Sequence, residues 1–379
     1  MAEGIKDLSF GSLAVKLLYT TPERIQDCLE IQQKIRDMGV KPKKLGEIMI
    51  DKGYLTDQQV RHIFRVQGAE GGIHELPGYQ ILGKVGQGAM GMVYKALQLS
   101  MGRAVAIKVL SPQLSDDEKF TKRFFKEARM SAWLNHPNIV QGIDVGEYQG
   151  LFYFVMEFVE GLTLEDFIKR EGALDEQRAM RIIYDIAQAL EHAHKYNLVH
   201  RDIKARNILI DEEEKAKLCD LGLAQIAVSE TGSPAVKGIL AGTPAYLSPE
   251  QAQRREDLDI RSDIYSLGVT LYFCVVGDLP FRGATALEVV AKHVNEEPVQ
   301  PIQRNANVSL TANYIIMKMM AKNRDERYQD PGELMRDLYA AMSGQVLVEP
   351  DQPRPHIRVP SRISKVTGVV RRKFRRYRK

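Results

Sequence analysis

Three polar side chains lie close together in the segment that begins at His200. Asp202 is followed by Lys204 and then by Asn207. A carboxylate can accept a proton from a hydroxyl group, a lysine can contact a phosphate, and an amide oxygen suits Mg²⁺. The spacing is therefore typical of a loop that transfers a phosphoryl group to a hydroxyl. The tripeptide 200–202 also arises by chance, so the other motifs of the chain decide its meaning.

A glycine-rich stretch at 86–91 lies between two predicted strands, with glycine at positions 86, 88 and 91. Backbone N–H groups must come very close to phosphate oxygens, and side chains at these positions would block the approach. A plain glycine turn and a Rossmann loop are the alternatives. A Rossmann loop runs directly into a helix, whereas residues 93–96 continue as strand, so we favour a loop that covers phosphates.

Lys108 lies on the following predicted strand, and Glu127 lies in a predicted helix at 120–134. A lysine on a strand is more often a solvated surface residue. Here it stands fifteen residues after Val93 and nineteen before Glu127. We expect Lys108 to hold the α- and β-phosphates of a nucleotide while Glu127 fixes its position.

Asp220 follows the apolar run 216–219 and is itself followed by Leu221 and Gly222. Carboxylate, amide and phosphate oxygens together suit Mg²⁺. We therefore expect Asp220 to bind one Mg²⁺ and Asn207 a second.

Short strand-like segments precede a series of helices in the region after residue 77. A predicted helix at 176–196 has one apolar face, and Asp175 is placed to cap it. The predicted strands are 79–84, 92–97, 104–109 and 151–157. A small strand-rich lobe followed by a larger helical lobe predicts an α+β fold.

From Gly78 to about Ala341 the chain resembles the eukaryotic-like Ser/Thr protein kinases of bacteria, through the motifs given above. The resemblance implies a two-lobed protein kinase fold, ATP and Mg²⁺ as cofactors, and Ser or Thr hydroxyls of protein substrates as acceptors. It implies four catalytic residues, Asp202, Lys204, Lys108 and Glu127. The implied ATP-binding residues are Val85, Gly86, Gly88, Gly91, Val93, Ala106, Lys108, Met156, Glu157 and Val159, with Met156 as gatekeeper and 157–159 as hinge.

The same resemblance assigns supporting roles to residues of the helical lobe. Asp263 would hold the backbone of the catalytic loop, and Arg327 would pair with Glu250. Arg201 marks kinases whose activation loop is ordered by phosphorylation. The threonines that bacterial relatives phosphorylate are replaced here by Lys237 and Ala235, so autophosphorylation at Thr231 or Ser233 is the hypothesis for this chain.

The first seventy residues contain a repeat with an offset of 35. Apolar positions step by three and four in each unit, which predicts two helical hairpins that pack as one module over 1–67. Lys44-Leu45-Gly46 and Gly53 resemble the N-terminal domain of type II secretion and pilus ATPases, some members of which bind cyclic di-GMP. Unit one departs from that pattern, with Ser9 for the basic residue and Leu18 for the glycine. We favour a helical module for docking or dimerisation. We therefore expect it to bind a regulatory ligand or a protein partner, or to form a homodimer.

Residues 68–77 are rich in Gly and lack periodicity, which predicts a linker, with a kinase domain at 78–343 and a basic tail at 344–379. The tail has eleven Lys or Arg against two acidic residues, a net charge of +9, and the rest of the chain carries −5. Such a tail is a solvated end, a contact for an anionic membrane surface, or a non-specific nucleic-acid contact. We favour weak binding to an anionic surface.

The composition, 44 % hydrophobic and 27 % charged, is that of a globular protein. The sequence lacks an apolar run of membrane-spanning length and a signal-peptide layout, so we expect a cytoplasmic protein, peripheral at the inner membrane surface if the tail binds there. Cys28, Cys219 and Cys274 have no metal-ligand spacing and are interpreted as reduced thiols. The rival interpretations are a pseudokinase scaffold and a small-molecule phosphotransferase. The complete set of ionisable residues disfavours the first, and an intact segment at 242–250 disfavours the second.

Overall fold

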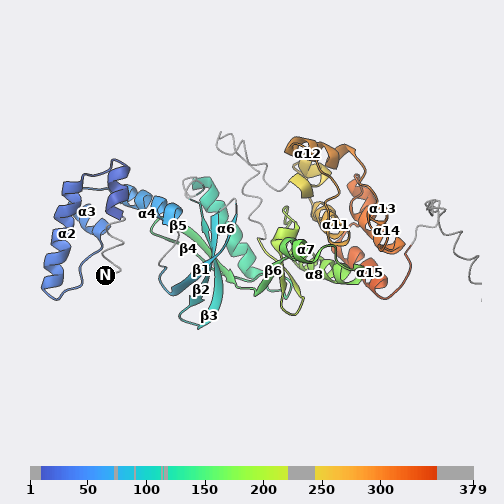
Figure 1. The fold of residues 1–379 in the computed structure, drawn as a ribbon, viewed down its shortest axis with the longest axis horizontal. Helices are drawn as coiled ribbons and strands as arrows, with labels where there is room; N and C mark the ends of the chain where they lie inside the picture. Colours follow the sequence, from blue (N-terminus) through green and yellow to red (C-terminus); the bar gives the residue numbers. More distant parts are fainter. Residues whose placement is uncertain are drawn as a thin grey trace, which may run out of the picture.

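A helical module, a β-rich small lobe and a helical large lobe follow one another along the long axis of the molecule (Figure 1). The computed structural model describes residues 10–71, 76–88, 91–111, 114, 118–220 and 244–347. The predicted phosphorylation sites Thr231 and Ser233, most of the basic tail and residues 1–9 lie outside these ranges.

The N-terminal module is built of two similar hairpins, as the repeat predicts. A helical stretch at 10–16 and α2 (Pro22–Asp37) form the first hairpin, and α3 (Leu45–Asp51) and α4 (Asp57–Gly71) form the second. In each hairpin the glycine of the first helix faces a β-branched residue of the second. A Cβ on Gly11 would lie 3.1 Å from Ile25, and a Cβ on Gly46 would lie 3.1 Å from Val60. Both pairs keep the 35-residue offset, so the two units share their internal packing.

The two hairpins also exchange equivalent hydrogen bonds. Tyr54 donates its hydroxyl to Asp27 of the first hairpin at 2.8 Å. Tyr19, which is offset by 35 from Tyr54, contacts Nδ1 of His62 in the second hairpin at 2.7 Å. His62 is in turn offset by 35 from Asp27. The module therefore has an approximate two-fold relation between its halves, around one shared apolar core.

The helix caps of the module differ between the units. Thr56 and Gln59 form a capping box, with Gln59 N donating to Thr56 Oγ1 and Thr56 N donating to Gln59 Oε1. At α2, Thr21 stands at the N-cap and Pro22 at the first helical position, but the Thr21 side chain accepts no hydrogen bond from the helix amides. Thr21 is thus the N-cap of α2 without a side-chain hydrogen bond, whereas Thr56 caps α4 with one.

The small lobe is one antiparallel sheet with α6 (Glu118–Trp133) packed on one face. The strand order is β1-β2-β3-β5-β4. The strands are β1 (Tyr79–Gly88), β2 (Gly91–Gln98), β3 (Arg103–Leu110), β4 (Gly142–Tyr148) and β5 (Leu151–Glu157). Four of them correspond to predicted strands, and β4 was not predicted. The second face of the sheet covers another apolar cluster.

The stretch expected to be a linker, 68–77, is ordered at both of its described ends. Helix α4 continues to Gly71, and Leu76 is only 2 % exposed because it packs in the apolar cluster on the second face of the sheet. A single apolar side chain at position 76 thus anchors the chain to the small lobe.

The large lobe is helical around a small sheet of order β6-β7-β8. Helix α11 forms its centre and is buried on nearly all sides. The Asp175 carboxylate accepts from Arg178 N, which confirms the predicted cap of α8. The elements are β6 (Gly161–Thr163), α7 (Leu164–Glu171), α8 (Glu176–His194), η1 (Ala205–Asn207), β7 (Ile208–Asp211), β8 (Ala216–Leu218), η3 (Pro244–Tyr246), α10 (Pro249–Ala252), α11 (Ile260–Val276), α12 (Ala286–Asn295), α13 (Pro301–Arg304), α14 (Leu310–Met319), η4 (Arg324–Glu326) and α15 (Pro331–Met342).

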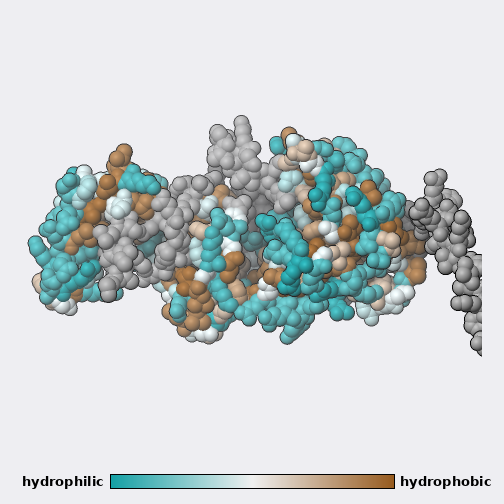
Figure 2. Space-filling view, viewed as in Figure 1, coloured by the Kyte–Doolittle hydropathy of each residue, from teal (hydrophilic) through white to brown (hydrophobic). Residues whose placement is uncertain are grey.

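Hydrophilic residues cover the face of the large lobe around α7 (Figure 2), whereas the apolar side of α7, with Leu164, Phe167 and Ile168, is buried. Among the described residues, no helix combines the length and the apolar character that crossing a membrane requires.

Candidate active site

The predicted catalytic loop lies between α8 and β7, where η1 turns the chain. The ammonium of Lys204 donates to Asp202 Oδ2 at 2.6 Å, and the amide of Asn207 donates to the same oxygen at 3.0 Å. Asn207 also donates to the Asp202 carbonyl at 2.9 Å, which closes the turn. The structure therefore brings together the three side chains that the sequence motif singled out.

A buried carboxylate from α11 fixes the backbone of this loop. Asp263 accepts from the backbone N–H of His200 at 2.7 Å and from that of Arg201 at 2.8 Å. Burial raises the pKa of Asp263, and the two amides and the charges of His200 and Arg201 offset part of that effect. Arg201 has φ +66°, so the loop keeps a left-handed residue beside Asp202. The geometry matches the supporting role expected for Asp263.

Lys108 and Asp220 meet between the two lobes. Lys108 is 6 % exposed, and its Nζ lies 2.7 Å from Asp220 Oδ1. Burial alone would raise the pKa of Asp220, but the charge and hydrogen bond of Lys108 outweigh it and hold that pKa below its usual range. The expected pairing of Lys108 with Glu127 stays a prediction, because the Glu127 side chain is outside the described residues.

Asn207 and Asp220 lie on neighbouring segments, which suits two metal ions bound side by side. The N–H and the thiol of Cys219 both point to the Asn207 carbonyl, at 2.9 and 3.2 Å. Burial raises the pKa of Cys219, so its thiol stays protonated and structural. No cluster of three or more His, Cys, Asp or Glu side chains suited to a metal occurs among the described residues. One carboxylate and one amide nevertheless fit Mg²⁺, which commonly keeps waters and substrate phosphates as further ligands.

The glycine-rich stretch is a hairpin between antiparallel strands, which excludes the Rossmann alternative. Gly88 pairs with Gly91 at the end of the β1–β2 ladder. A Cβ on Gly91, which has φ +147°, would lie 1.9 Å from the Val109 carbonyl oxygen, so only glycine fits against β3. Added Cβ atoms on Gly86 and Gly88 would meet open space. Those two positions therefore offer a bare backbone to a ligand.

An apolar cluster joins the two lobes beside this hairpin. Ala106 and Met156 are buried in it, and Val93 packs against it from the small lobe. Leu209 of β7 packs on the same cluster from the large lobe. Leu209 was not predicted from the sequence. Ile208 and Ile210 of the same strand are buried, whereas Leu209 points the other way and is half-buried.

The hinge follows β5. Glu157 directs its carboxylate to Lys217 of β8, with Oε1 at 2.6 Å from Nζ, so its side chain bridges the lobes. Any contact of Glu157 with a nucleotide would therefore use its backbone. Val159 packs on the apolar cluster, whereas Val85 is 53 % exposed.

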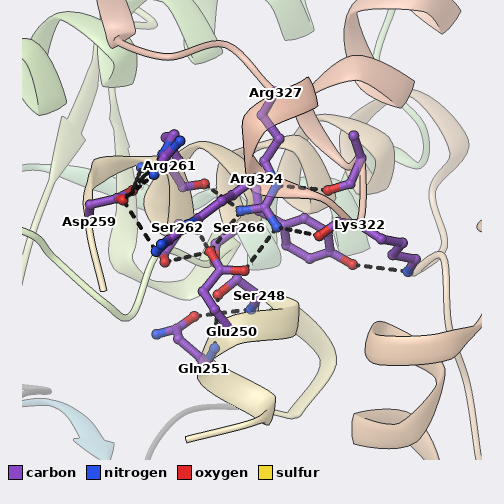
Figure 3. Close-up of polar contacts among 12 residues, drawn as sticks. Ser248, Glu250, Gln251, Asp259, Arg261, Ser262, Ser266, Lys322, Arg324 and Arg327 are labelled. Atoms are coloured by element: carbon purple, nitrogen blue, oxygen red, sulfur yellow. Dashed lines mark hydrogen bonds and ion pairs between the residues drawn. The ribbon is translucent and has the colours of Figure 1, made fainter. Parts of the chain in front are cut away.

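A buried ion pair joins the segment after the activation loop to the end of the large lobe (Figure 3). Arg327 donates from both terminal nitrogens to Glu250, at 2.7 and 2.9 Å, and Ser262 donates to the same carboxylate at 2.6 Å. Burial alone would raise the pKa of Glu250, but the hydrogen bond and charge of Arg327 outweigh it and lower that pKa. The expected pairing of Glu250 and Arg327 is confirmed.

The geometry agrees with the comparison with known protein families. A family model described as the protein kinase domain matches residues 79–339. The chain belongs to the protein kinase family.

Curated relatives of the kinase domain include two bacterial proteins. The chain is 41 % identical over 281 residues to the serine/threonine-protein kinase PknB of Mycolicibacterium smegmatis, covering 73 % of this chain and 44 % of that protein. It is 39 % identical over 271 residues to the serine/threonine-protein kinase PrkC of Bacillus subtilis, covering 72 % and 41 %. The chain thus spans less than half the length of either relative.

Among solved structures, the PknI kinase domain of Mycobacterium tuberculosis superposes with a TM-score of 0.56 at 23 % identity. The match covers 70 % of this chain and 96 % of that domain. This likeness confirms the two-lobed kinase fold that the sequence predicted.

Proposed function

We propose that this chain is an ATP-dependent protein kinase that transfers the γ-phosphoryl group to Ser or Thr hydroxyls of protein substrates. The observation that carries the proposal is the meeting of Lys108 from the small lobe with Asp220 of the large lobe, beside the Asp202–Lys204–Asn207 loop. The curated relatives that align over the kinase domain are named serine/threonine-protein kinases, which supports the same acceptor class.

The proposed mechanism assigns one task to each residue. The bare backbone at Gly86 and Gly88 contacts the phosphates, and Lys108 offsets charge on them. Asp202 orients the acceptor hydroxyl and takes its proton as the new O–P bond forms. The bond between the γ-phosphorus and its bridging oxygen breaks, and ADP leaves. Lys204 offsets the charge that develops on the transferred group.

One Mg²⁺ is assigned to Asp220, which Lys108 keeps anionic, and a second is assigned to Asn207. When bound, Mg²⁺ would neutralise charge on the phosphates. The adenine is proposed to lie against the apolar side chains of Ala106, Val93, Leu209 and Met156. The backbone of 157–159 supplies its hydrogen bonds. The proposed roles of Val85 and Glu127 rest on the sequence resemblance alone.

The test is incubation of the full chain with radiolabelled ATP, Mg²⁺ and a basic protein substrate, beside Asp202→Asn. Label on Ser or Thr that falls by roughly 10²–10⁴ in rate in the variant is the expected result. Equal thermal stability of the two proteins controls for folding. No label from either protein, with nucleotide still bound, would favour the pseudokinase scaffold. Label on small molecules alone would favour the small-molecule phosphotransferase.

Regulation and location are finer proposals. The repeat in residues 1–67 suggests that a ligand, a protein partner or a second copy of the chain binds there and regulates the kinase. The hydroxyl residues of the activation loop suggest autophosphorylation at Thr231 or Ser233. The positive charge of residues 344–379 suggests a cytoplasmic protein whose tail contacts an anionic membrane surface. Each basic residue near such a surface contributes about 1 kcal/mol to the binding free energy. Phosphopeptide mapping and vesicle binding with and without residues 371–379 test these points.

A further inference from the structure

The β4–β5 hairpin presents one side chain to the N-terminal module. Tyr148 stands at the end of β4 and pairs with Leu151 across a two-residue turn. Both turn residues, Gln149 and Gly150, have a left-handed backbone, with φ +52° and +74°. This is the geometry of a tight hairpin turn that twists with its strands. Gln149 also donates to the Tyr148 hydroxyl at 3.3 Å, so the turn holds the ring in place.

The residue that meets Tyr148 belongs to the module. The ammonium of Lys44 donates to the Tyr148 hydroxyl at 3.2 Å and lies 5.8 Å from the centre of its ring. Lys44 is the N-cap of α3 and precedes the buried residues Leu45 and Gly46. The contact joins residues that are 104 positions apart in the chain.

Two further observations place the module at this edge of the sheet. Helix α4 runs from the module toward β5 (Figure 1). It ends at Gly71, and Leu76 is fixed in the apolar cluster of the small lobe together with Leu151 of β5. Five residues of chain can span at most about 18 Å, so the module is held within a short distance of the sheet.

The hairpin is also connected to the proposed active site. Phe152 of β5 contacts Phe125 of α6 edge-on, with ring centres 5.7 Å apart. Phe154, two residues further on, pairs with Lys108 of β3. A displacement of the hairpin would therefore reach both the helix that carries Glu127 and the strand that carries Lys108.

We propose that the β4–β5 hairpin is the docking surface for the N-terminal module of the same chain, and that the Lys44–Tyr148 contact couples the module to the kinase domain. The inference rests on the proposed function and adds the surface through which it is regulated. A partner that binds the module and withdraws Lys44 would release the hairpin and change the phosphoryl-transfer rate.

The test compares full-length Lys44→Gln, Tyr148→Phe and the double variant with the wild type. Lys43→Gln is the matched control, because the neighbouring Lys43 pairs with Asp51 inside the module at 2.7 Å. Amide hydrogen exchange is expected to quicken in 142–157 for the first three proteins and to stay unchanged for the control. The phosphoryl-transfer rate is expected to change about three-fold in each single variant, with no further change in the double variant, because an exposed contact is worth 1 kcal/mol or less.

Unchanged exchange at 142–157 in Lys44→Gln, or additive effects in the double variant, would overturn the proposal. A variant that carries both Lys44→Cys and Tyr148→Cys, treated with a short bis-maleimide cross-linker, shows whether the hairpin binds the module of its own chain or that of a second copy. Cross-linking within one chain supports it, whereas cross-linked dimers would assign the surface to the module of a second copy and overturn it. A wild type that transfers no phosphate refutes the proposed function, and the exchange and cross-linking results then still decide the docking.

Discussion

Leu18 and Gly53 occupy the same turn in the two units of the N-terminal module. Both have a left-handed backbone, with φ +59° at Leu18 and +69° at Gly53. The hydrogen bonds around them are equivalent as well, since Tyr19 N donates to Ala14 O and Tyr54 N donates to Met49 O. A residue with a Cβ pays about 1–2 kcal/mol for this conformation. The Leu18 side chain is 91 % exposed, so packing does little to offset that cost.

We expect Leu18→Gly to stabilise the module, by about 1 kcal/mol after the larger backbone entropy of glycine in the unfolded chain is subtracted. Hydrogen exchange of the amides in α2 and α3 within the full chain measures the change. The matched control is Gly53→Leu, which should accelerate exchange of the same helices. Faster exchange in Leu18→Gly would show that the leucine side chain makes a stabilising contact.

The ion pair of Glu250 and Arg327 gives a second prediction for single residues. Both side chains are almost fully buried, so removal of one leaves the other as an uncompensated buried charge. Arg327→Leu should lower the free energy of unfolding of the kinase domain by about 3–5 kcal/mol at neutral pH. Arg255→Leu, which breaks an exposed pair with Asp257, should change little. Urea denaturation compares the two, and equal losses would contradict the assignment.

The pH dependence of this pair follows from the lowered pKa of Glu250. Because the folded-state pKa lies below the ordinary value of 4.5, the stabilisation is complete above that value. It is lost as the pH falls through the folded-state pKa. The free energy of unfolding of the wild type should thus fall as the pH is lowered below 4.5. The fall should be smaller in Arg327→Leu, which lacks the pair.

At the scale of elements, long amphipathic helices and apolar strands were predicted well, because each carries its own periodicity. Helix α8 and strand β5 lie within two residues of their expected ends. Strand β4 was missed because it contains Gly142, Gly146 and charged residues, and only its pairing with β5 and its packing on α6 define it. Leu209 was missed for a related reason, since its neighbours come from the other lobe.

A stacked pair of histidines joins two elements of different lobes. His136 follows α6, His192 lies in the last turn of α8, and their ring centres are 5.1 Å apart. The His136 Nδ1 also accepts from the backbone N–H of Asn138 at 3.2 Å. Burial lowers the pKa of His136, and the charges of His192 and Lys195 lower it further, while Glu191 acts in the opposite direction. The folded protein therefore favours a neutral His136.

This stack should make the contact between the lobes sensitive to acid. With a folded-state pKa below 6.5, the stabilisation is complete above pH 6.5 and is lost as the pH falls below it. His136→Asn keeps an acceptor for Asn138 N and removes the titration. The fall in melting temperature between pH 7.5 and 5.5 should be smaller in His136→Asn than in the wild type. An identical fall in both proteins would exclude His136 as a source of acid sensitivity.

At the scale of the whole molecule, the sequence predicted the order of the parts but not their contacts. The motifs at 86–91, 108, 202–207 and 220 each specify local chemistry, and their order in the chain is enough to predict a two-lobed kinase. The contact of Lys44 with Tyr148 has no such signal. It depends on a turn in one domain and a helix start in another, which the anchoring of Leu76 and the approach of α4 to β5 bring together.

Because the proposed nucleotide site is shared between the lobes, a bound nucleotide should stabilise the kinase domain as one unit. A ligand at one hundred times its dissociation constant adds about 2.7 kcal/mol to the free energy of unfolding. ADP with Mg²⁺ should therefore raise the melting temperature, and EDTA should remove the metal-dependent part of the increase. Asp220→Ala should abolish that part, because Asp220 is the proposed carboxylate ligand, while Lys43→Gln should respond like the wild type. If EDTA left the increase in the wild type unchanged, the nucleotide would be bound without a metal, and the scaffold would become the better explanation of this arrangement.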